Sequence, residues 1–185
     1  MPLPLHVAFV AGSLGMWRIE RITPVNGDTL PPAQRLAVLE GLKASSAPAT
    51  AASWALRGTT SNARYTNRSE IDALTVKQEM LFRASATCAA LIPIRKSSAW
   101  WDLAQDERRA IFEEQSQHIR IGLEYLPAVA RRLHHSRELG EPFDFLTWFE
   151  YAPEHAAAFE EMVCRLRDTA KCHYVEREVD IRLSR

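Results

Sequence analysis

The stretch Tyr174-Val-Glu-Arg-Glu-Val-Asp-Ile-Arg-Leu183, near the end of the chain, alternates between two kinds of position. One set of alternating side chains is mostly charged and the other is mostly apolar. Successive side chains of a β-strand point to opposite faces. The spacing therefore predicts a strand over residues 173–183 with one mostly charged face.

Five further segments have the β-branched, aromatic and apolar composition of strands. They cover residues 6–11, 16–22, 53–59, 85–96 and 143–151. The link Gly12-Ser-Leu-Gly15 between the first two predicts a hairpin connection. Pro93 removes a backbone donor from the run Cys88-Ala-Ala-Leu-Ile-Pro-Ile94, so we expect it near a sheet edge or a bulge.

Apolar residues at helical spacing predict helices over residues 31–43, 105–139 and 153–168, and residues 68–80 are expected to form a short polar helix. Pro127 interrupts the segment 105–139. Because proline removes a helical hydrogen bond, we expect two helical arms there with a kink or restart between them.

Strands and helices mix without the strict alternation that a parallel sheet requires. This order favours an α+β fold, a ferredoxin-like antiparallel sheet with helices on its outer face. The 185 residues suffice for one compact unit. We expect residues 1–96 to form a truncated N-terminal ferredoxin-like half and residues 97–185 a second half that holds the functional site.

Charge and cysteine content exclude several classes of protein. Lys and Arg total 23 and Asp and Glu total 23, so the net charge is zero and the basic excess of a nucleic-acid binder is missing. Three cysteines, Cys88, Cys164 and Cys172, form no Cys-x-x-Cys pair. This pattern is typical of reduced thiols rather than of a disulfide framework.

The apolar N-terminal run has no Lys or Arg before it and contains two prolines. A secretory signal has a basic start and an uninterrupted apolar stretch, so the run predicts a strand instead. No segment approaches the roughly 18 consecutive apolar residues of a membrane span. We therefore expect a cytoplasmic protein with no membrane or nucleic-acid partner.

Common catalytic motifs, such as a phosphate-binding glycine loop or a zinc cysteine pair, are not found. Among the six histidines, His118 is the strongest candidate because it shares a helical face with Gly122. A glycine one turn along would let a flat ligand approach the backbone. Two interpretations stay open for His118: a buried, hydrogen-bonded histidine, or an axial ligand of a metal or a haem.

Arg131 follows His118 by thirteen positions. On one straight helix the two side chains would lie about 20 Å apart on different faces. A break at Pro127 would let the second arm fold back and aim Arg131 at the far side of whatever His118 holds. The alternative is a surface charge, which the neighbouring Arg132 favours.

The segment Leu91-Ile-Pro-Ile-Arg-Lys-Ser-Ser-Ala-Trp-Trp101 ends a predicted strand with cations and two tryptophans. Such a segment could clamp a flat, apolar, anionic ligand, since cations bind carboxylates and indoles cover apolar faces. The alternative is an edge strand with an exposed cationic end and tryptophans packed in the core.

Together these segments resemble the chlorite dismutase family, haem b proteins of the dimeric α+β barrel superfamily, and specifically its short, dimeric branch. The resemblance runs from about residue 50 to the end. It rests on residues 54–65, 91–101, 107–118, 125–135, 143–150 and 174–183.

The resemblance implies a role for each residue that matches the family pattern. His118 falls on the proximal ligand of the haem iron, and Arg131 falls on the distal arginine, which would make it the catalytic residue. Four positions match residues that contact the haem: Lys96, Trp100 and Tyr65 near the propionates, and Trp101 at the haem edge and subunit interface.

One position departs from the family pattern. The family's glutamate that accepts a hydrogen bond from the proximal histidine should fall in the segment Thr169-Ala-Lys-Cys-His-Tyr174, where this chain has Lys171. An ammonium group cannot accept that proton. Asp168, just upstream, is a possible substitute.

The resemblance implies an enzyme that converts chlorite to chloride and molecular oxygen at a haem b, and that assembles as a homodimer. A guanidinium suits this chemistry because it stays cationic and donates several hydrogen bonds to an anion. The rival functions are a haem-dependent peroxidase, a coproporphyrin-haem decarboxylase and a haem-binding sensor or carrier without turnover. Decarboxylating relatives lack the distal arginine, so Arg131 argues against that rival.

Overall fold

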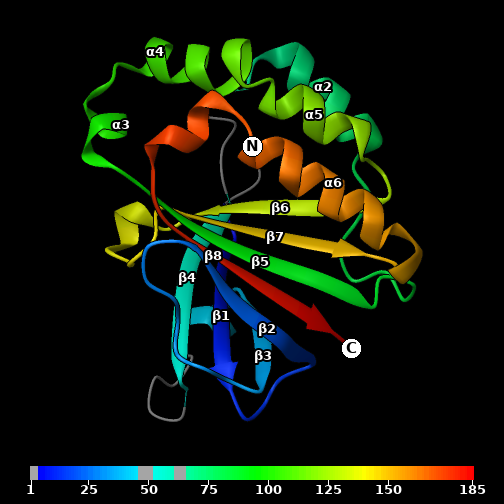
Figure 1. Ribbon diagram of the computed structural model, residues 1–185. Helices are drawn as coiled ribbons and strands as arrows, with labels where there is room; N and C mark the ends of the chain where they lie inside the picture. Colours follow the sequence, from blue (N-terminus) through cyan, green and yellow to red (C-terminus); the bar gives the residue numbers. More distant parts are fainter. Residues whose placement is uncertain (1–3, 46–51, 61–65) are drawn as a thin grey trace.

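The computed structural model describes residues 4–45, 52–60 and 66–185. The strands form a closed antiparallel barrel in the order β1-β3-β2-β8-β5-β7-β6-β4 (Figure 1). The predicted α+β class with an antiparallel sheet is confirmed. The strands are β1 (His6–Gly12), β2 (Trp17–Asn26), β3 (Arg35–Glu40), β4 (Trp54–Thr60), β5 (Cys88–Lys96), β6 (Val129–His135), β7 (Phe145–Tyr151) and β8 (Val175–Ser184).

The strand order repeats along the barrel. It consists of the segment β4-β1-β3-β2 followed by the segment β8-β5-β7-β6. In each segment the fourth strand in chain order comes first, followed by the first, the third and the second. This is the strand order of a ferredoxin-like unit. We propose two halves within one compact unit, and this order favours a division before β5 rather than after residue 96.

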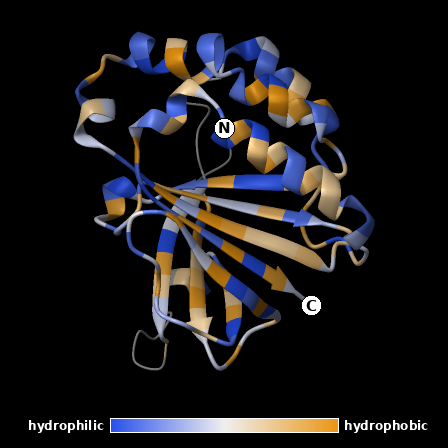
Figure 2. Cartoon of the chain, viewed as in Figure 1, coloured by the Kyte–Doolittle hydropathy of each residue, from blue (hydrophilic) through white to orange (hydrophobic). Residues whose placement is uncertain are grey.

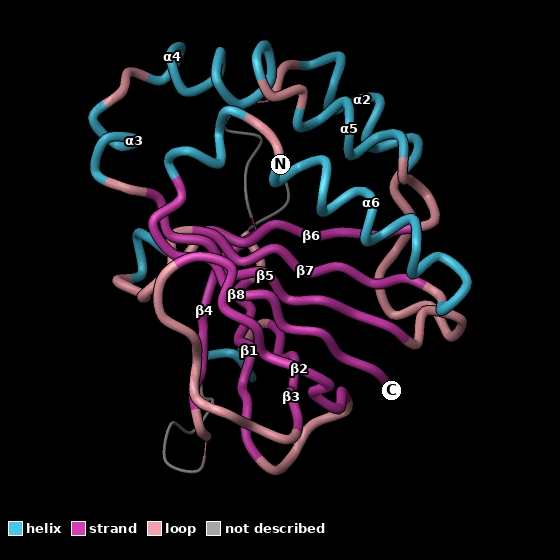
Figure 3. The backbone as a smooth tube through the Cα atoms, viewed as in Figure 1, coloured by secondary structure: helices cyan, strands magenta, loops and turns pink. Residues whose placement is uncertain are grey.

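The longer helices gather on one outer side of the barrel, over β5, β6 and β7 (Figures 1 and 3). Among the described helices, none has the length and apolar character needed to cross a membrane. The helical segments are α1 (Leu42–Ser45), α2 (Arg68–Lys77), α3 (Ser98–Asp102), α4 (Gln105–Arg109), the π-helix η2 (Ala110–Gln115), α5 (His118–Glu124), α6 (Ala156–Arg167), and the 3-10 turns η3 (Arg137–Leu139), η4 (Pro153–His155) and η5 (Ala170–Tyr174).

Two apolar layers stabilise this arrangement. Trp148 belongs to the layer inside the barrel, and its neighbour Phe149 belongs to the layer between the sheet and the helices. Phe149 packs on Phe159 of α6, with ring centroids 5.2 Å apart. Figure 2 shows the matching alternation of apolar and polar residues along β8. Each large apolar side chain buried in this way contributes about 1.5–3 kcal/mol.

The predicted helix over residues 31–43 is wrong, and so is the hairpin between the first two strands. Residues 35–40 form β3, which lies between β1 and β2, so that Leu36 is opposite both Ala11 and Trp17. Leu36, Leu39 and Leu42 do have helical spacing. Backbone pairing on both edges of β3 overrides that local preference.

The segment 105–139 is only partly helical. The helical arm breaks at Gln117, whose φ of 51° is left-handed, and it ends at Glu124. The expected second arm is instead the strand β6, since residues 129–135 pair with β7. Pro93 lies inside β5, between β7 and β8, rather than at a sheet edge, but a register irregularity between Arg95 and Lys96 follows it in the pairing with β8. Of the two expected positions, the one near a bulge is therefore confirmed. The helices predicted over 68–80 and 153–168 are confirmed as α2 and as η4 with α6.

Candidate active site

His118 is held by tight packing at the start of α5. The Phe112 ring contacts the imidazole with centroids 4.4 Å apart and 42° between the planes. The Glu113 carboxylate accepts a hydrogen bond from the backbone nitrogen of Ile119 at 2.6 Å. Glu113 therefore fixes the first turn of the helix that carries His118.

The environment of His118 favours a neutral imidazole. Burial, followed by the nearby charges of Lys171, Arg131 and Lys96, lowers the pKa of His118 well below its usual value. Its buried Nδ1 has no hydrogen-bond partner among the described residues. A neutral imidazole is the form that binds a metal, so His118 has the chemistry of an axial ligand.

Arg131 lies on β6, and its guanidinium packs against Gly122, one helical turn after His118. A Cβ built on Gly122 would lie 2.1 Å from Arg131 Nη1 and 2.6 Å from its Cζ. The glycine therefore makes room for a cation, where we expected it to admit a flat ligand. The structure brings Arg131 and His118 to the same region between α5 and the sheet, but from a strand rather than a second helical arm.

Burial lowers the pKa of Arg131, although the nearby charge of Glu113 acts to raise it. Within the described ranges, no carboxylate lies within 4 Å of the Arg131 guanidinium. Its backbone oxygen accepts a hydrogen bond from Gln78 Nε2 at 2.7 Å. A buried guanidinium without a paired carboxylate is suited to binding an anion.

Lys96 and Trp100 form a second part of the site. Lys96 ends β5, and its Nζ lies 4.5 Å from the centre of the Trp100 ring. Its ammonium donates a hydrogen bond to the Lys171 backbone oxygen at 2.5 Å. Burial, and then the charge of Lys171, lowers the pKa of Lys96 to about 7. Trp100 is buried on α3, whereas Lys96 is neither exposed nor at a sheet edge.

Asp144 connects Lys96 to Trp101 and was not predicted. Its Oδ2 accepts hydrogen bonds from the Lys96 backbone nitrogen at 2.7 Å and from Trp101 Nε1 at 3.3 Å. Trp101 stacks on Phe145, and the Arg137 guanidinium lies 3.9 Å from its ring centre. The available signal was an acidic residue between Phe143 and Phe145 in an otherwise aromatic segment.

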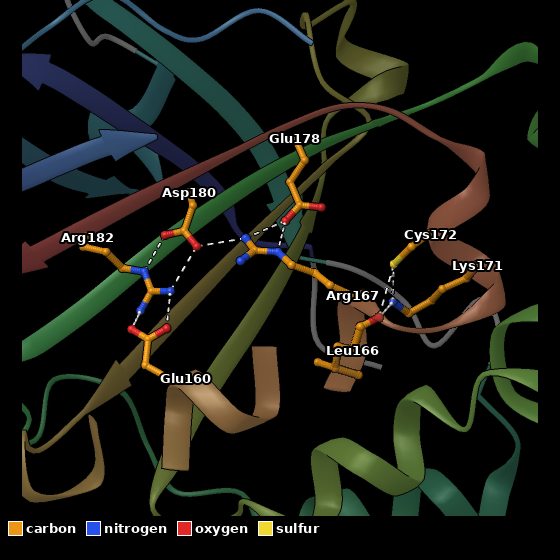
Figure 4. Close-up of polar contacts among 8 residues, drawn as sticks. All are labelled: Glu160, Leu166, Arg167, Lys171, Cys172, Glu178, Asp180 and Arg182. Atoms are coloured by element: carbon orange, nitrogen blue, oxygen red, sulfur yellow. Dashed lines mark hydrogen bonds and ion pairs between the residues drawn. The ribbon is translucent and has the colours of Figure 1, made fainter. Parts of the chain in front are cut away.

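Lys171 is buried close to the His118 segment. Its backbone nitrogen donates to Ser116 Oγ at 3.0 Å, two residues before His118. Its Nζ donates to the Leu166 backbone oxygen at 3.0 Å and lies 3.5 Å from Cys172 Sγ (Figure 4). Burial lowers the pKa of Lys171. The position of the expected acceptor is therefore near His118, but an amine occupies it.

Two other sequence candidates are not part of this arrangement. Asp168 is exposed at the end of α6, and no described residue pairs with His118 Nδ1, so Asp168 does not supply the missing acceptor. Tyr65 lies outside the described residues.

The charged face of β8 is buried beneath α6 rather than solvated. The Arg182 guanidinium donates hydrogen bonds to both Asp180 and Glu160 (Figure 4). The Arg167 guanidinium donates to Glu178 at 2.7 Å and to Asp180 at 2.8 Å. Isolated buried charges are costly, and these are paired. The cluster fixes α6, and the chain leaving α6 carries Lys171.

Known proteins share this architecture and much of this sequence. The chlorite dismutase family model matches residues 36–185. The crystal structure of a dimeric chlorite dismutase from Nitrobacter winogradskyi superposes with a TM-score of 0.89 and 55% identity, covering 97% of this chain and 99% of that one. A chlorite dismutase structure from Candidatus Nitrospira defluvii, at 20% identity and a TM-score of 0.72, covers 98% of this chain and 90% of its own and shares the fold.

A curated relative, the chlorite dismutase of Ideonella dechloratans, is 37% identical over 62 residues. That alignment spans 34% of this chain and only 20% of the relative. The family match, by contrast, includes His118, Arg131, Lys96 and the whole of the second half of the barrel. This chain belongs to the chlorite dismutase family.

Proposed function

We propose that the protein is a haem b enzyme that converts chlorite to chloride and molecular oxygen. The observation that carries this proposal is the pairing of a neutral His118 imidazole, whose buried Nδ1 is unpartnered, with the buried Arg131 guanidinium one helical turn away. An axial ligand for the iron and a cation that binds the substrate anion are the two groups through which the protein would promote this reaction.

The residues present fit a haem. His118 would bind the iron, since its imidazole is neutral and packed in one orientation. Lys96 and Trp100 would contact the propionates, Trp101 the haem edge, and Tyr65 the propionate side. When bound, the haem iron supplies the centre at which the oxygen atoms of chlorite are rearranged.

Arg131 acts on the substrate side. Its guanidinium stays cationic at any working pH, so it draws in the chlorite anion and orients it by charge-assisted hydrogen bonds. It also retains the chlorine–oxygen fragment until chloride is released. Gly122 leaves the space in which this cation sits.

Lys171 makes the His118 side different from the family pattern. No described carboxylate accepts the Nδ1 proton, so nothing there adds electron density to the imidazole. We also propose a homodimer, which the dimeric relative at 55% identity supports. A cytoplasmic location stays a prediction from the sequence.

An oxygen electrode tests the function. Ferric protein mixed with chlorite should release oxygen promptly, and His118→Ala should lose both its haem absorbance and the oxygen signal. Slow dye oxidation with peroxide, without oxygen release from chlorite, would indicate a peroxidase. Conversion of coproporphyrin haem would indicate a decarboxylase, and haem binding with none of these activities would indicate a sensor or carrier.

A further inference from the structure

Lys171 and Cys172 place a nucleophilic nitrogen and a nucleophilic sulfur next to each other. Lys171 Nζ lies 3.5 Å from Cys172 Sγ (Figure 4). Both atoms also contact the Leu166 backbone oxygen, the nitrogen at 3.0 Å and the sulfur at 3.2 Å. This shared acceptor fixes the pair at the end of α6. The other two cysteines, in the described ranges, have no recorded lysine contact.

The two groups differ in exposure in a way that suits sequential chemistry. Cys172 is partly exposed, so a small oxidant can reach its sulfur. Lys171 is 9% exposed, so its nitrogen is shielded from bulk solvent but faces that sulfur. Burial lowers the pKa of Lys171, so less free energy is needed to form the unprotonated amine than for an exposed lysine.

We propose that Lys171 and Cys172 are a redox modification site, at which hypochlorous acid joins Nζ to Sγ as a sulfenamide. The inference rests on the proposed function for the origin of the oxidant, because chlorite turnover produces hypochlorous acid whenever the chlorine–oxygen fragment escapes. The cross-link itself depends only on the pair and the oxidant.

The reaction balances in two steps. The sulfur of Cys172 takes the chlorine of hypochlorous acid, forming a sulfenyl chloride and releasing water. Lys171 Nζ then attacks the sulfur, an S–N bond forms, chloride leaves and the nitrogen loses one proton. Sulfur is oxidised by two electrons and chlorine is reduced to chloride. Sulfenamides are a known step on the cysteine oxidation ladder, and thiols reverse them.

Proximity decides which product forms. A sulfenyl chloride in water hydrolyses and is oxidised further to sulfinic and sulfonic acids. An amine held in contact has an effective concentration far above that of any dissolved nucleophile. The cross-link should therefore form in preference to irreversible oxidation, and it should protect Cys172 beside the active site.

Peptide mass spectrometry tests the proposal on the full chain. In Cys88→Ser/Cys164→Ser protein, Cys172 is the one remaining cysteine, so an intramolecular disulfide cannot form. After one equivalent of hypochlorous acid, trypsin should no longer cut after Lys171. Residues 168–177 should then appear as one uncut peptide, lighter by about 2 Da, the mass of two hydrogens. Dithiothreitol should restore both the mass and the cut.

Three results would overturn the proposal. One is oxygen added to Cys172 with normal cleavage after Lys171, and another is an unmodified Cys172. The third is a product lighter by the same mass in Lys171→Arg protein, which would place the S–N bond on another nitrogen. Cys172→Ser in the same background is the matched control and must keep the cut.

The use of added hypochlorous acid, rather than chlorite, as the oxidant separates the test of this proposal from the test of the proposed function. A cross-link formed with added hypochlorous acid supports the site whether or not chlorite releases oxygen. Lack of oxygen release in the electrode assay counts against the proposed function alone.

Discussion

The Arg131 guanidinium occupies the space that a side chain on Gly122 would fill, with Nη1 2.1 Å from the position of the missing Cβ. The obstructing atoms are the far end of a flexible side chain rather than backbone. A methyl group at residue 122 would therefore displace the cation and leave the fold in place.

Gly122→Ala should reduce the rate of oxygen release from chlorite while the protein stays folded. Alanine favours a helix over glycine by about 1 kcal/mol, so the free energy of unfolding should hold or rise slightly. Displacing the guanidinium should lower the rate about tenfold, since about 1.4 kcal/mol of lost transition-state stabilisation is one decade. Urea unfolding and an oxygen electrode measure the two effects.

The double variant Gly122→Ala/Arg131→Ala is the control. If Gly122 acts through Arg131, the double variant should be no slower than Arg131→Ala alone. If the two substitutions instead lower the rate of oxygen release by independent factors that multiply, Gly122 does not act through Arg131.

Most of the strands could be predicted from the sequence because successive side chains point alternately into the barrel and out of it, and this alternation is visible in the residue pattern. Trp148 and Phe149 illustrate this, since neighbouring residues enter different apolar layers. The strands β3 and β6 could not be predicted. Their local spacing suits a helix, and only pairing with strands distant in sequence decides their conformation.

The candidate site shows the same limit. His118, Arg131, Lys96, Trp100 and Trp101 were named from the local sequence and the family resemblance, and their roles remain proposals. Glu113 and Asp144 were missed because each acts by accepting backbone hydrogen bonds across a turn or between strands. Such contacts leave no periodic trace in a sequence.

Lys171→Glu should lower the Fe(III)/Fe(II) potential of the haem-bound protein. A carboxylate at residue 171 could accept the unpartnered Nδ1 proton of His118, which makes the imidazole a stronger electron donor and stabilises ferric iron. The parent protein should correspondingly have a higher potential than relatives with a glutamate at this position. Spectroelectrochemical titration measures the shift.

Lys171→Met separates the two effects of that substitution. It removes the amine without adding an acceptor, so any shift it causes reflects the loss of the amine alone. If Lys171→Glu and Lys171→Met give the same potential, the carboxylate does not bond His118 and the interpretation fails.

Asp180→Asn should destabilise the protein at neutral pH and remove part of its acid sensitivity. Burial acts to raise the pKa of Asp180, but hydrogen bonds from Arg182 and Arg167 outweigh it, so the pKa is lowered. A lowered carboxyl pKa contributes stability above the unfolded value, about 3.9, and that stability is lost as pH falls through the folded value. Because Arg182 and Arg167 keep their other partners, the free energy of unfolding at pH 7 should fall by about 2–3 kcal/mol.

Urea unfolding from pH 7 to pH 2.5 measures this dependence. The difference in free energy of unfolding between the parent and Asp180→Asn should be constant above about pH 5 and should narrow as the pH falls below that. Asp72→Asn, which breaks an exposed pair with Arg68, is the control and should change stability by less than about 0.5 kcal/mol. A difference that does not narrow between pH 5 and pH 2.5 would show that the Asp180 charge is not its source.

Arg131→Ala should keep a normal haem content, because we assign haem binding to His118, Lys96 and the apolar walls. Losing a charge-assisted hydrogen bond in a partly dry site costs about 1.5–3 kcal/mol, which lowers the rate of oxygen release by about one to two decades.

The side product is the more informative readout for Arg131→Ala. Without the cation, the chlorine–oxygen fragment should escape before chloride is released. A trap such as monochlorodimedone should then be chlorinated, and the haem should bleach after fewer turnovers than in the parent. The matched variant Arg132→Ala removes a cation that pairs with Glu40 instead, and it should leave the trap unreacted. If Arg131→Ala releases oxygen as fast and for as long as the parent, with no added chlorination, then Arg131 does not retain the intermediate and the distal role assigned to it is wrong.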